Sequence, residues 1–399
     1  MPARDPSDFG QIQKVDATTK RCIYVLFPCD FLACRMRRTG ARFAQQIMNA
    51  DSKDFLKRLV ETPSPSGYEH DVQKLVRERI RPWCDSVRTD VMGNVFGVRN
   101  PEGKPRVMLA GHCDQIGFIV QYITDEGFLY LEPIGGVDPV VATSQRVSIM
   151  TRRGLVPGVI GRKAIHLMDD EDKKKVPKIH DLYVDIGAKS KEDALKVISV
   201  GDAGIFVQLY RELANQRAVS MAFDNKMGTW IVTETLRLLH RRQFGACVIG
   251  VSTVQEEIGL RGATASAFSS EADVGIALDV AHGTDTPGVE KKRAGDFHVG
   301  KGPMIFRGAN INPRVFDLLL SAAKEKKIPY QVASAARGTG TDANPMQLSR
   351  GGMATGLLSV PLRYMHTPNE LLSLEDLENT ARLLAAFCTN LNKDQDFTP

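Results

Sequence analysis

Short apolar runs separated by helical patterns are the feature that most constrains how this chain folds. Residues 106–110 are almost entirely apolar, which is typical of a strand buried on both faces of a sheet. Comparable strand patterns recur at 247–255, 274–280 and 356–364. Apolar residues at helical spacing predict helices at 52–60, 68–80, 226–241, 313–326 and 373–391. Strands that alternate with helices predict an α/β protein with a largely parallel sheet.

The middle of the chain has a different character. Residues 119–213 contain short strand-like runs, many glycines and a charged loop at 169–175. This pattern predicts a small β domain inserted into a larger α/β domain, which is formed by residues 48–118 and 214–399.

The first 47 residues differ from both parts. They mix turn formers, an isolated apolar patch and a basic cluster at 35–38, without a sustained period. We expect this segment to be a disordered extension, or to be untranslated if synthesis begins at Met48.

Composition narrows the possible partners. Residues 1–47 hold eight Lys/Arg against four Asp/Glu, which is +4 of the formal net charge of +5 and leaves +1 on the other 352 residues. We therefore expect no nucleic-acid binding by the body of the protein. No apolar run approaches the ~18 residues of a membrane span, so we expect no membrane association. The seven scattered cysteines, with no C-x-x-C pair, favour reduced thiols and a cytoplasmic location.

Polar residues follow the apolar strands closely. In open α/β sheets the ligand site lies at the carboxyl ends of the strands, so such residues are expected to meet at one edge. Four strand ends contribute His or carboxylate side chains, and a loop-to-helix junction adds one more: His112, Asp114, Glu256, Glu257, Asp279, His366 and Asp224.

Each of these residues has an ordinary structural explanation when it is taken alone. A single histidine is usually a packed or surface residue, and Asp224 is also a plausible helix cap. The adjacent acids Glu256 and Glu257 are equally compatible with a solvated turn. Two histidines and several acids at one sheet edge favour a metal site over these explanations.

The residue types also indicate the chemistry. Imidazole and carboxylate donors without thiolate suit zinc, cobalt or manganese. Two histidines and three carboxylates suffice for two ions about 3.5–4 Å apart if one carboxylate bridges them. Asp114, two residues after His112, fits a carboxylate that orients a ligand imidazole. One acid of the pair at 256 and 257 then remains free as a general base, and Cys113 is expected in the core.

Six motifs in order resemble the tetrahedral-assembly and glutamyl-type aminopeptidases of metallopeptidase family 42. The motifs are GHCDQIG at 111–117, FDNKMG at 223–228, VQEEIGLRGA at 254–263, ALD at 277–279, GTDA at 340–343 and SVPLRYMHTPNE at 359–370. The resemblance covers roughly residues 50–392, and residues 1–47 have no counterpart in it.

The resemblance implies a role for each site residue. Asp224 would bridge two divalent ions, zinc or cobalt. His112 and Asp279 would complete one ion, and Glu257 and His366 the other. Glu256 would be the general base, with Asp114 behind His112 as a second catalytic residue.

The resemblance also implies the architecture. The sheet would be sandwiched by helices, as in zinc aminopeptidases. The inserted β domain would mediate dimerisation, giving a homo-oligomer that is based on dimers and extends to a dodecamer. The substrates would be peptides that lose their N-terminal amino acid.

The substrate pocket is expected near Arg337, Thr341 and Asp342, although the glycines there also fit a plain loop. Arg307 and Arg337 would favour an acidic side chain, but the preference for the N-terminal residue stays open.

Three alternatives remain open at this point. A related dinuclear metallo-hydrolase of acylated amino acids or dipeptides shares the metal chemistry. A glycoside hydrolase also uses paired acids, and some relatives carry an endoglucanase label. Its two carboxylates must flank a bond at a separation of about 5–9.5 Å, which adjacent acids do not suggest. A metal-dependent scaffold without activity is the non-enzymatic alternative.

Overall fold

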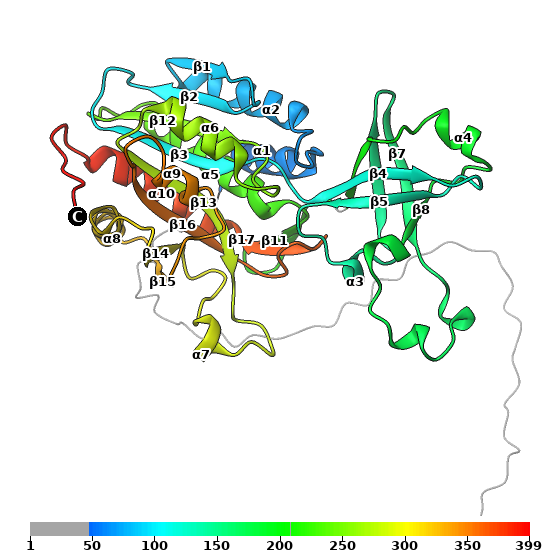
Figure 1. The fold of residues 1–399 in the computed structure, drawn as a ribbon. Coiled ribbons are helices and arrows are strands. Elements are labelled where there is room, and N and C mark those ends of the chain that lie inside the picture. Colours follow the sequence, from blue (N-terminus) through cyan, green and yellow to red (C-terminus); the bar gives the residue numbers. More distant parts are fainter. Residues whose placement is uncertain (1–47, 208) are drawn as a thin grey trace, which may run out of the picture. The chain divides into compact units, whose positions relative to one another are not determined.

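A computed structural model describes residues 48–207 and 209–399 (Figure 1). Its largest element is an eight-stranded sheet with the order β1-β2-β12-β3-β13-β16-β14-β15. The strands span Ser86–Thr89, Val95–Arg99, Cys247–Thr253, Arg106–His112, Val274–His282, Ala354–Leu362, Met304–Gly308 and Gln331–Ala335, in that order. No helix in the described part of the chain is long and apolar enough to cross a membrane.

The centre of the sheet is parallel, and most of the outer pairings are antiparallel. Strands β12, β3, β13 and β16 run parallel to one another. The pairs β1–β2, β2–β12 and β14–β16 are antiparallel, whereas β14–β15 is parallel. The α/β class is therefore confirmed, and the sheet is mixed. Because the four central strands share one direction, their carboxyl ends reach the same edge of the sheet.

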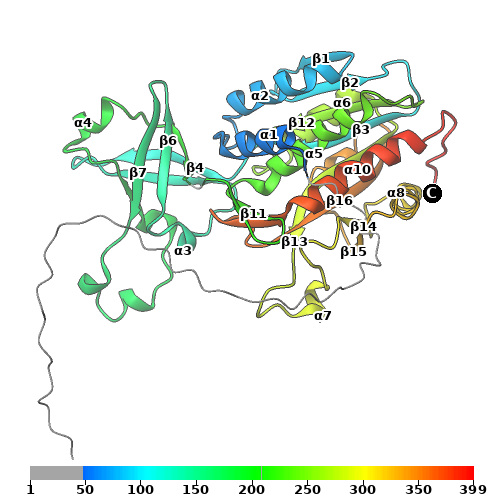
Figure 2. The same ribbon diagram turned by 180° about the vertical axis from the view of Figure 1, so that it is seen from behind.

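Helices cover both faces of this sheet (Figures 1 and 2). A Cβ atom placed on Gly250 of β12 would meet α5 (Phe223–Leu239), and one on Gly356 of β16 would meet α8 (Pro313–Glu325). A Cβ on Gly275 of β13 would point the other way, onto Met346 of α9 (Ala343–Gln347). The remaining long helices are α1 (Ala50–Glu61), α2 (His70–Ile80), α6 (Arg261–Ser270) and α10 (Leu374–Asn390).

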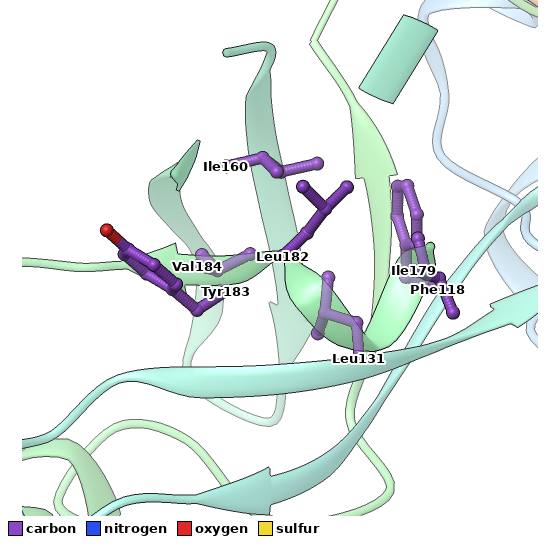
Figure 3. A pocket seen from close by; sticks show the side chains of 7 residues that line it. All are labelled: Phe118, Leu131, Ile160, Ile179, Leu182, Tyr183 and Val184. Carbon is purple, nitrogen blue, oxygen red and sulfur yellow. The ribbon is translucent and has the colours of Figure 1, made fainter. Parts of the chain in front are cut away.

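Between β3 and α5 the chain forms a closed six-stranded barrel in the order β4-β5-β8-β7-β6-β9. The strands are β4 (Gly117–Ile123), β5 (Leu129–Ile134), β6 (Arg146–Thr151), β7 (Gly154–Gly161), β8 (Tyr183–Asp185) and β9 (Ala203–Phe206). The barrel has its own apolar core, separate from that of the sheet. Figure 3 shows Phe118, Leu131, Ile160 and Leu182 around a cavity in this core. Its volume is about 10 Å³, so it holds nothing larger than a water molecule.

Most predicted elements are present with shifts of one to three residues. The predicted helix at 226–241 begins earlier, as α5, and Asp224 and Asn225 near its start have non-helical backbone angles. The strand predicted at 274–280 continues to His282. The sequence pattern did not reveal β14 and β15. It also missed the small antiparallel sheet of β10 (Arg211–Leu213), β11 (Arg217–Ser220) and β17 (Glu370–Ser373). The prediction for residues 1–47 lies outside the described residues.

Close contact between β3 and α5 gives a first test. A Cβ atom on Gly111 would lie 2.5 Å from the carbonyl carbon of Gly228, a backbone atom that cannot rotate away. We expect Gly111→Ala to lower the free energy of unfolding by about 1–3 kcal/mol, because the helix must move off the strand. Urea unfolding of the metal-free protein measures this change. Gly351→Ala is the control, since its Cβ would meet no atom within 4 Å. Equal midpoints for the two variants would contradict the prediction.

Candidate metal centre

The predicted histidines and acids lie together at the carboxyl edge of the sheet. His112 is the last residue of β3 and pairs in register with Thr253, the last residue of β12. Glu256 and Glu257 follow three and four residues after Thr253. The other members of the cluster are Asp279 within β13, His366 after β16, and Asp224 near the start of α5.

The side chains form overlapping donor groups, in each of which one possible ligand atom per residue lies within 4.8 Å of the others. The groups are His112 with Asp224 and Asp279, Asp224 with Glu257 and His366, and His112 with Glu256 and Glu257. Asp224 connects the first two. Its Oδ1 lies 3.5 Å from Nε2 of His112, and its Oδ2 lies 3.3 Å from Nε2 of His366. The two oxygens of one carboxylate therefore face two different imidazoles.

Both imidazoles are oriented by acceptors on their far side. Nδ1 of His112 lies 3.2 Å from the main-chain oxygen of Asp114, and Nδ1 of His366 lies 3.1 Å from the main-chain oxygen of Gly136. A carbonyl oxygen only accepts, so each Nδ1 carries a proton, and Nε2 is the nitrogen of each ring that faces the acids. Asp114 also places Oδ1 at 3.4 Å from the same Nδ1 of His112. It therefore lies behind His112, where the sequence placed it.

The cluster carries more negative charge than its surroundings compensate. Burial and neighbouring carboxylates raise the pKa of Glu256 to about 7, and they hold the pKa values of Glu257 and Asp279 well above the usual range. Burial would also raise the pKa of Asp224, but the two imidazoles outweigh it and lower that pKa to about 2. Oε1 of Glu257 is buried without a hydrogen-bond partner. Several buried carboxylates that converge with two imidazole nitrogens fit a divalent cation.

A second set of acids shapes the turn that carries Glu256 and Glu257. Asp114 accepts the N–H of Glu256 at Oδ1 (3.0 Å) and the N–H of Glu257 at Oδ2 (3.2 Å). Glu69 accepts the N–H of Gln255 at Oε1 (3.1 Å), and Gln255 has a left-handed backbone with φ of 57°. Three successive N–H groups are thus held by two buried carboxylates. This turn is what allows both adjacent acids to face the cluster.

Sequence reasoning missed three buried residues around the cluster: Glu69, Lys226 and Glu370. Lys226 donates from Nζ to the main-chain oxygen of Thr62 and to Oε1 of Gln115. Lys226 and Glu370 lie in two of the six sequence motifs, and Glu69 follows the loop at 62–67, so all three lie in or beside segments that the sequence marks as loops or motifs. Their contacts depend on chain segments that lie far apart in the sequence, which spacing alone does not reveal.

The predicted substrate residues are more dispersed. Arg337 is exposed in the loop after β15, and the hydroxyl of Thr341 lies 2.9 Å from that of Thr339. Asp342 is buried, and its Oδ2 accepts a hydrogen bond of 2.6 Å from the hydroxyl of Thr253. Asp342 therefore ties the loop at 340–343 to the strand that leads to Glu256.

The family model of the M42 glutamyl aminopeptidases matches residues 93–383. The chain belongs to this family. The protein is therefore a peptidase of the M42 aminopeptidase family. Because this is a family of metallopeptidases, membership implies a divalent metal ion. All members of the donor groups lie within the matched residues, whereas Glu69, which holds the turn behind them, precedes the match.

Individual relatives agree with this assignment. The chain is 38% identical over 350 residues to a lysyl aminopeptidase of Pyrococcus furiosus, covering 87% of this chain and 99% of the relative. The solved structure of a TET aminopeptidase from a marine-sediment Thaumarchaeota archaeon superposes with a TM-score of 0.82 at 33% identity, over 86% of this chain and 97% of that one. The TET1 peptidase of Pyrococcus horikoshii gives a TM-score of 0.75 at 30% identity, over 85% and 100%.

The buried acid Glu69, which lies behind the candidate metal centre of this M42 aminopeptidase, should make the stability of the protein depend on pH. Burial and the charge of Asp114 raise the pKa of Glu69 from 4.5 to about 7. The folded protein therefore holds this proton more tightly than the unfolded chain does. The resulting stabilisation is complete below about pH 4.5 and is lost as the pH rises through about 7.

We expect the melting temperature of the metal-free protein to fall between pH 5 and 7.5, and to fall less in Glu69→Gln. The glutamine keeps an oxygen that accepts the N–H of Gln255 but has no proton to lose. Glu102→Gln, at an exposed acid, is the control and should match the wild type. Parallel pH profiles for the wild type and Glu69→Gln would contradict this prediction.

Proposed function

We propose that this peptidase is a two-metal aminopeptidase, which removes N-terminal amino acids from peptides. The observation that carries this proposal is the position of Asp224, whose two oxygens face His112 and His366. His112, Asp224 and Asp279 would hold one divalent ion, and Asp224, Glu257 and His366 the other. Zinc or cobalt suits donors that are imidazoles and carboxylates without thiolate.

Bound divalent ions lower the pKa of water and polarise a substrate carbonyl. Glu256 belongs to neither of the two groups that share Asp224. Its Oε2 lies 3.6 Å from Nε2 of His112, and its N–H is fixed by Asp114. Glu256 is therefore placed to take a proton from the attacking water and to return it to the leaving amine. Asp114 supports this role by holding the turn and the imidazole of His112 together.

The surrounding charge supports cleavage at the N-terminus. A free α-amino group is a cation near neutral pH, and the excess of carboxylates would attract it. We assign the substrate side to the loop that contains Arg337, Thr341 and Asp342. Asp342 would act there by holding the loop against Thr253. Which N-terminal residue is preferred is a property that substrate profiling must establish.

We also propose that the barrel of β4 to β9 mediates dimerisation, in a homo-oligomer that extends to a dodecamer. The large apolar side chains Ile165, Leu167 and Val176 are exposed there, which supports an interface. A solved structure of the relative PhTET1 is described as a dodecamer. The four cysteines of the described residues are free thiols, which supports the cytoplasm as the location.

The alternatives make different use of these residues. A hydrolase of acylated amino acids or dipeptides shares the metal donors, so only the substrate separates it from an aminopeptidase. A glycoside hydrolase gives no role to His112 and His366. In addition, Glu256 and Glu257 are adjacent residues on one turn, whereas the catalytic pair of such enzymes flanks the scissile bond.

A substrate panel tests the proposed function. We expect hydrolysis of aminoacyl 4-nitroanilides and little or none of their N-acetylated forms, because the free amine is the feature recognised. Dialysis against a chelator should abolish the activity, and zinc or cobalt should restore it. Equal rates on acetylated substrates, or full activity after chelation, would contradict the proposal. Metal content is determined on the same samples.

Substitution of the proposed base tests the mechanism. Glu256→Gln keeps the shape of the side chain but cannot accept the proton of water. We expect kcat to fall by about 10²–10⁴-fold while the metal content stays at the wild-type level. Glu102→Gln serves as the control and should keep the wild-type kcat. Near wild-type activity of Glu256→Gln would show that another group moves the proton.

A further inference from the structure

The buried carboxylate of Glu370 connects two turns, one carrying Asp224 and the other His366. Both residues belong to the donor group that also contains Glu257. Oε2 of Glu370 accepts the main-chain N–H of Asp224 at 2.9 Å, and Oε1 accepts the main-chain N–H of His366 at 3.0 Å. Glu370 is 2% exposed. Each of its oxygens is therefore engaged with the backbone of a different donor residue.

Neither turn is a regular element whose own hydrogen bonds would fix it. Asp224 has φ of −78° and ψ of 105°, outside the helical range, although it lies within α5. His366 has a left-handed backbone with φ of 60°, which is uncommon for a residue with a side chain. The positions of both side chains thus depend on contacts from outside their own turns.

Strand pairing places Glu370 where it can make both contacts. Glu370 is the first residue of β17 and pairs with Ser220, the last residue of β11. From Ser220 the chain continues through two residues into α5, and so to Asp224. On its other side, Glu370 follows His366 by four residues. The small sheet of β10, β11 and β17 therefore joins the two donor turns through one side chain.

We propose that Glu370 is a positioning residue, which sets the relative placement of Asp224 and His366 so that their side chains converge on one cation. This inference rests on the proposed function, because it assumes that both residues are metal donors. Glu370 itself is not a donor in this scheme, since its two oxygens already accept from the backbone.

The chemistry of the side chain determines a suitable variant. A glutamine in place of Glu370 has one amide oxygen, so it can accept only one of the two N–H groups. Its amide nitrogen would then face the other N–H, donor against donor, and that turn would move. Glu370→Gln keeps the size of the side chain while it removes the connection between the two turns.

A matched control is available in the same part of the fold. Asp376 is also fully buried, and its two oxygens accept the N–H groups of Gly300 and Gly302. Neither glycine belongs to a donor group. Asp376→Asn therefore disturbs a similar pair of backbone hydrogen bonds without touching the proposed metal donors.

The test is a titration of the metal-free full chain with Co²⁺, followed by visible absorbance and by calorimetry. His366→Ala identifies the binding step that belongs to the group containing His366. We expect Glu370→Gln to weaken that step by about 10–100-fold, the usual effect of removing a group that holds a metal ligand in place. Asp376→Asn should bind Co²⁺ like the wild type.

The outcomes separate this inference from the proposed function. If the wild type binds no Co²⁺, the proposed function fails. If the wild type binds it and Glu370→Gln binds it equally well, the positioning role fails. A similar loss in Asp376→Asn would also overturn that role, because the effect would then be general destabilisation. If circular dichroism shows metal-free Glu370→Gln to be unfolded, Glu370→Asp replaces it. Its carboxylate is one methylene too short to reach both N–H groups, and an unchanged affinity would overturn the inference.

Discussion

Hydrogen bonds from main-chain N–H groups to buried carboxylates hold the candidate metal centre in shape. Asp114, Glu69 and Glu370 together accept five such bonds from the turns that carry, or lead to, the donor side chains. The parallel strands bring these turns to one edge of the sheet, but they do not determine which way a side chain points once its strand has ended. The acids behind the turns supply that information, and the donor groups depend on it.

The same arrangement concentrates negative charge where water cannot screen it. Burial raises the pKa values of Glu69, Glu256 and Asp342 to about 6–7, so the metal-free centre retains protons that exposed acids would have lost. Two imidazoles and the ammonium of Lys226 offset only part of the charge, and burial lowers the pKa of Lys226 to about 7. A divalent cation would displace protons from this centre, so metal binding and proton release are expected to be coupled. The excess of negative charge is thus what a site that binds a divalent cation requires.

The sequence predicted the four central strands of the large sheet and the candidate donor residues that the structure brings together, because both depend on local pattern. Apolar runs such as 106–110 mark buried strands, and a histidine or an acid at the end of such a run is conspicuous. Glu69 and Glu370 were missed as functional residues because an acid that accepts backbone N–H groups stands at no characteristic distance along the sequence from the residues that it holds. Their partners are 186 residues away for Glu69 and 146 for the more distant bond of Glu370. The antiparallel pairing of β14 with β16 was missed for a similar reason, since strand direction is set by how the chain returns to the sheet. The strand predicted at 274–280 is two residues longer in the structure, because its pairing with β16 continues to His282.

The barrel also takes part in the centre, which bears on why it is inserted after β3. The chain leaves β5 through Gly135 and Gly136, and the main-chain oxygen of Gly136 determines which nitrogen of His366 carries the proton. A Cβ atom on Gly136 would lie 2.9 Å from that same nitrogen, so a side chain there would push the imidazole away from Asp224. A Cβ on Gly135 would meet Ile116 at 2.8 Å and Glu257 at 3.3 Å, and Gly135 has φ of 75°. Two glycines therefore let a segment of the inserted barrel approach the donors closely enough to orient one of them. The loop that follows β5 and the candidate metal centre therefore touch at this point, through the hydrogen bond between Nδ1 of His366 and the main-chain oxygen of Gly136.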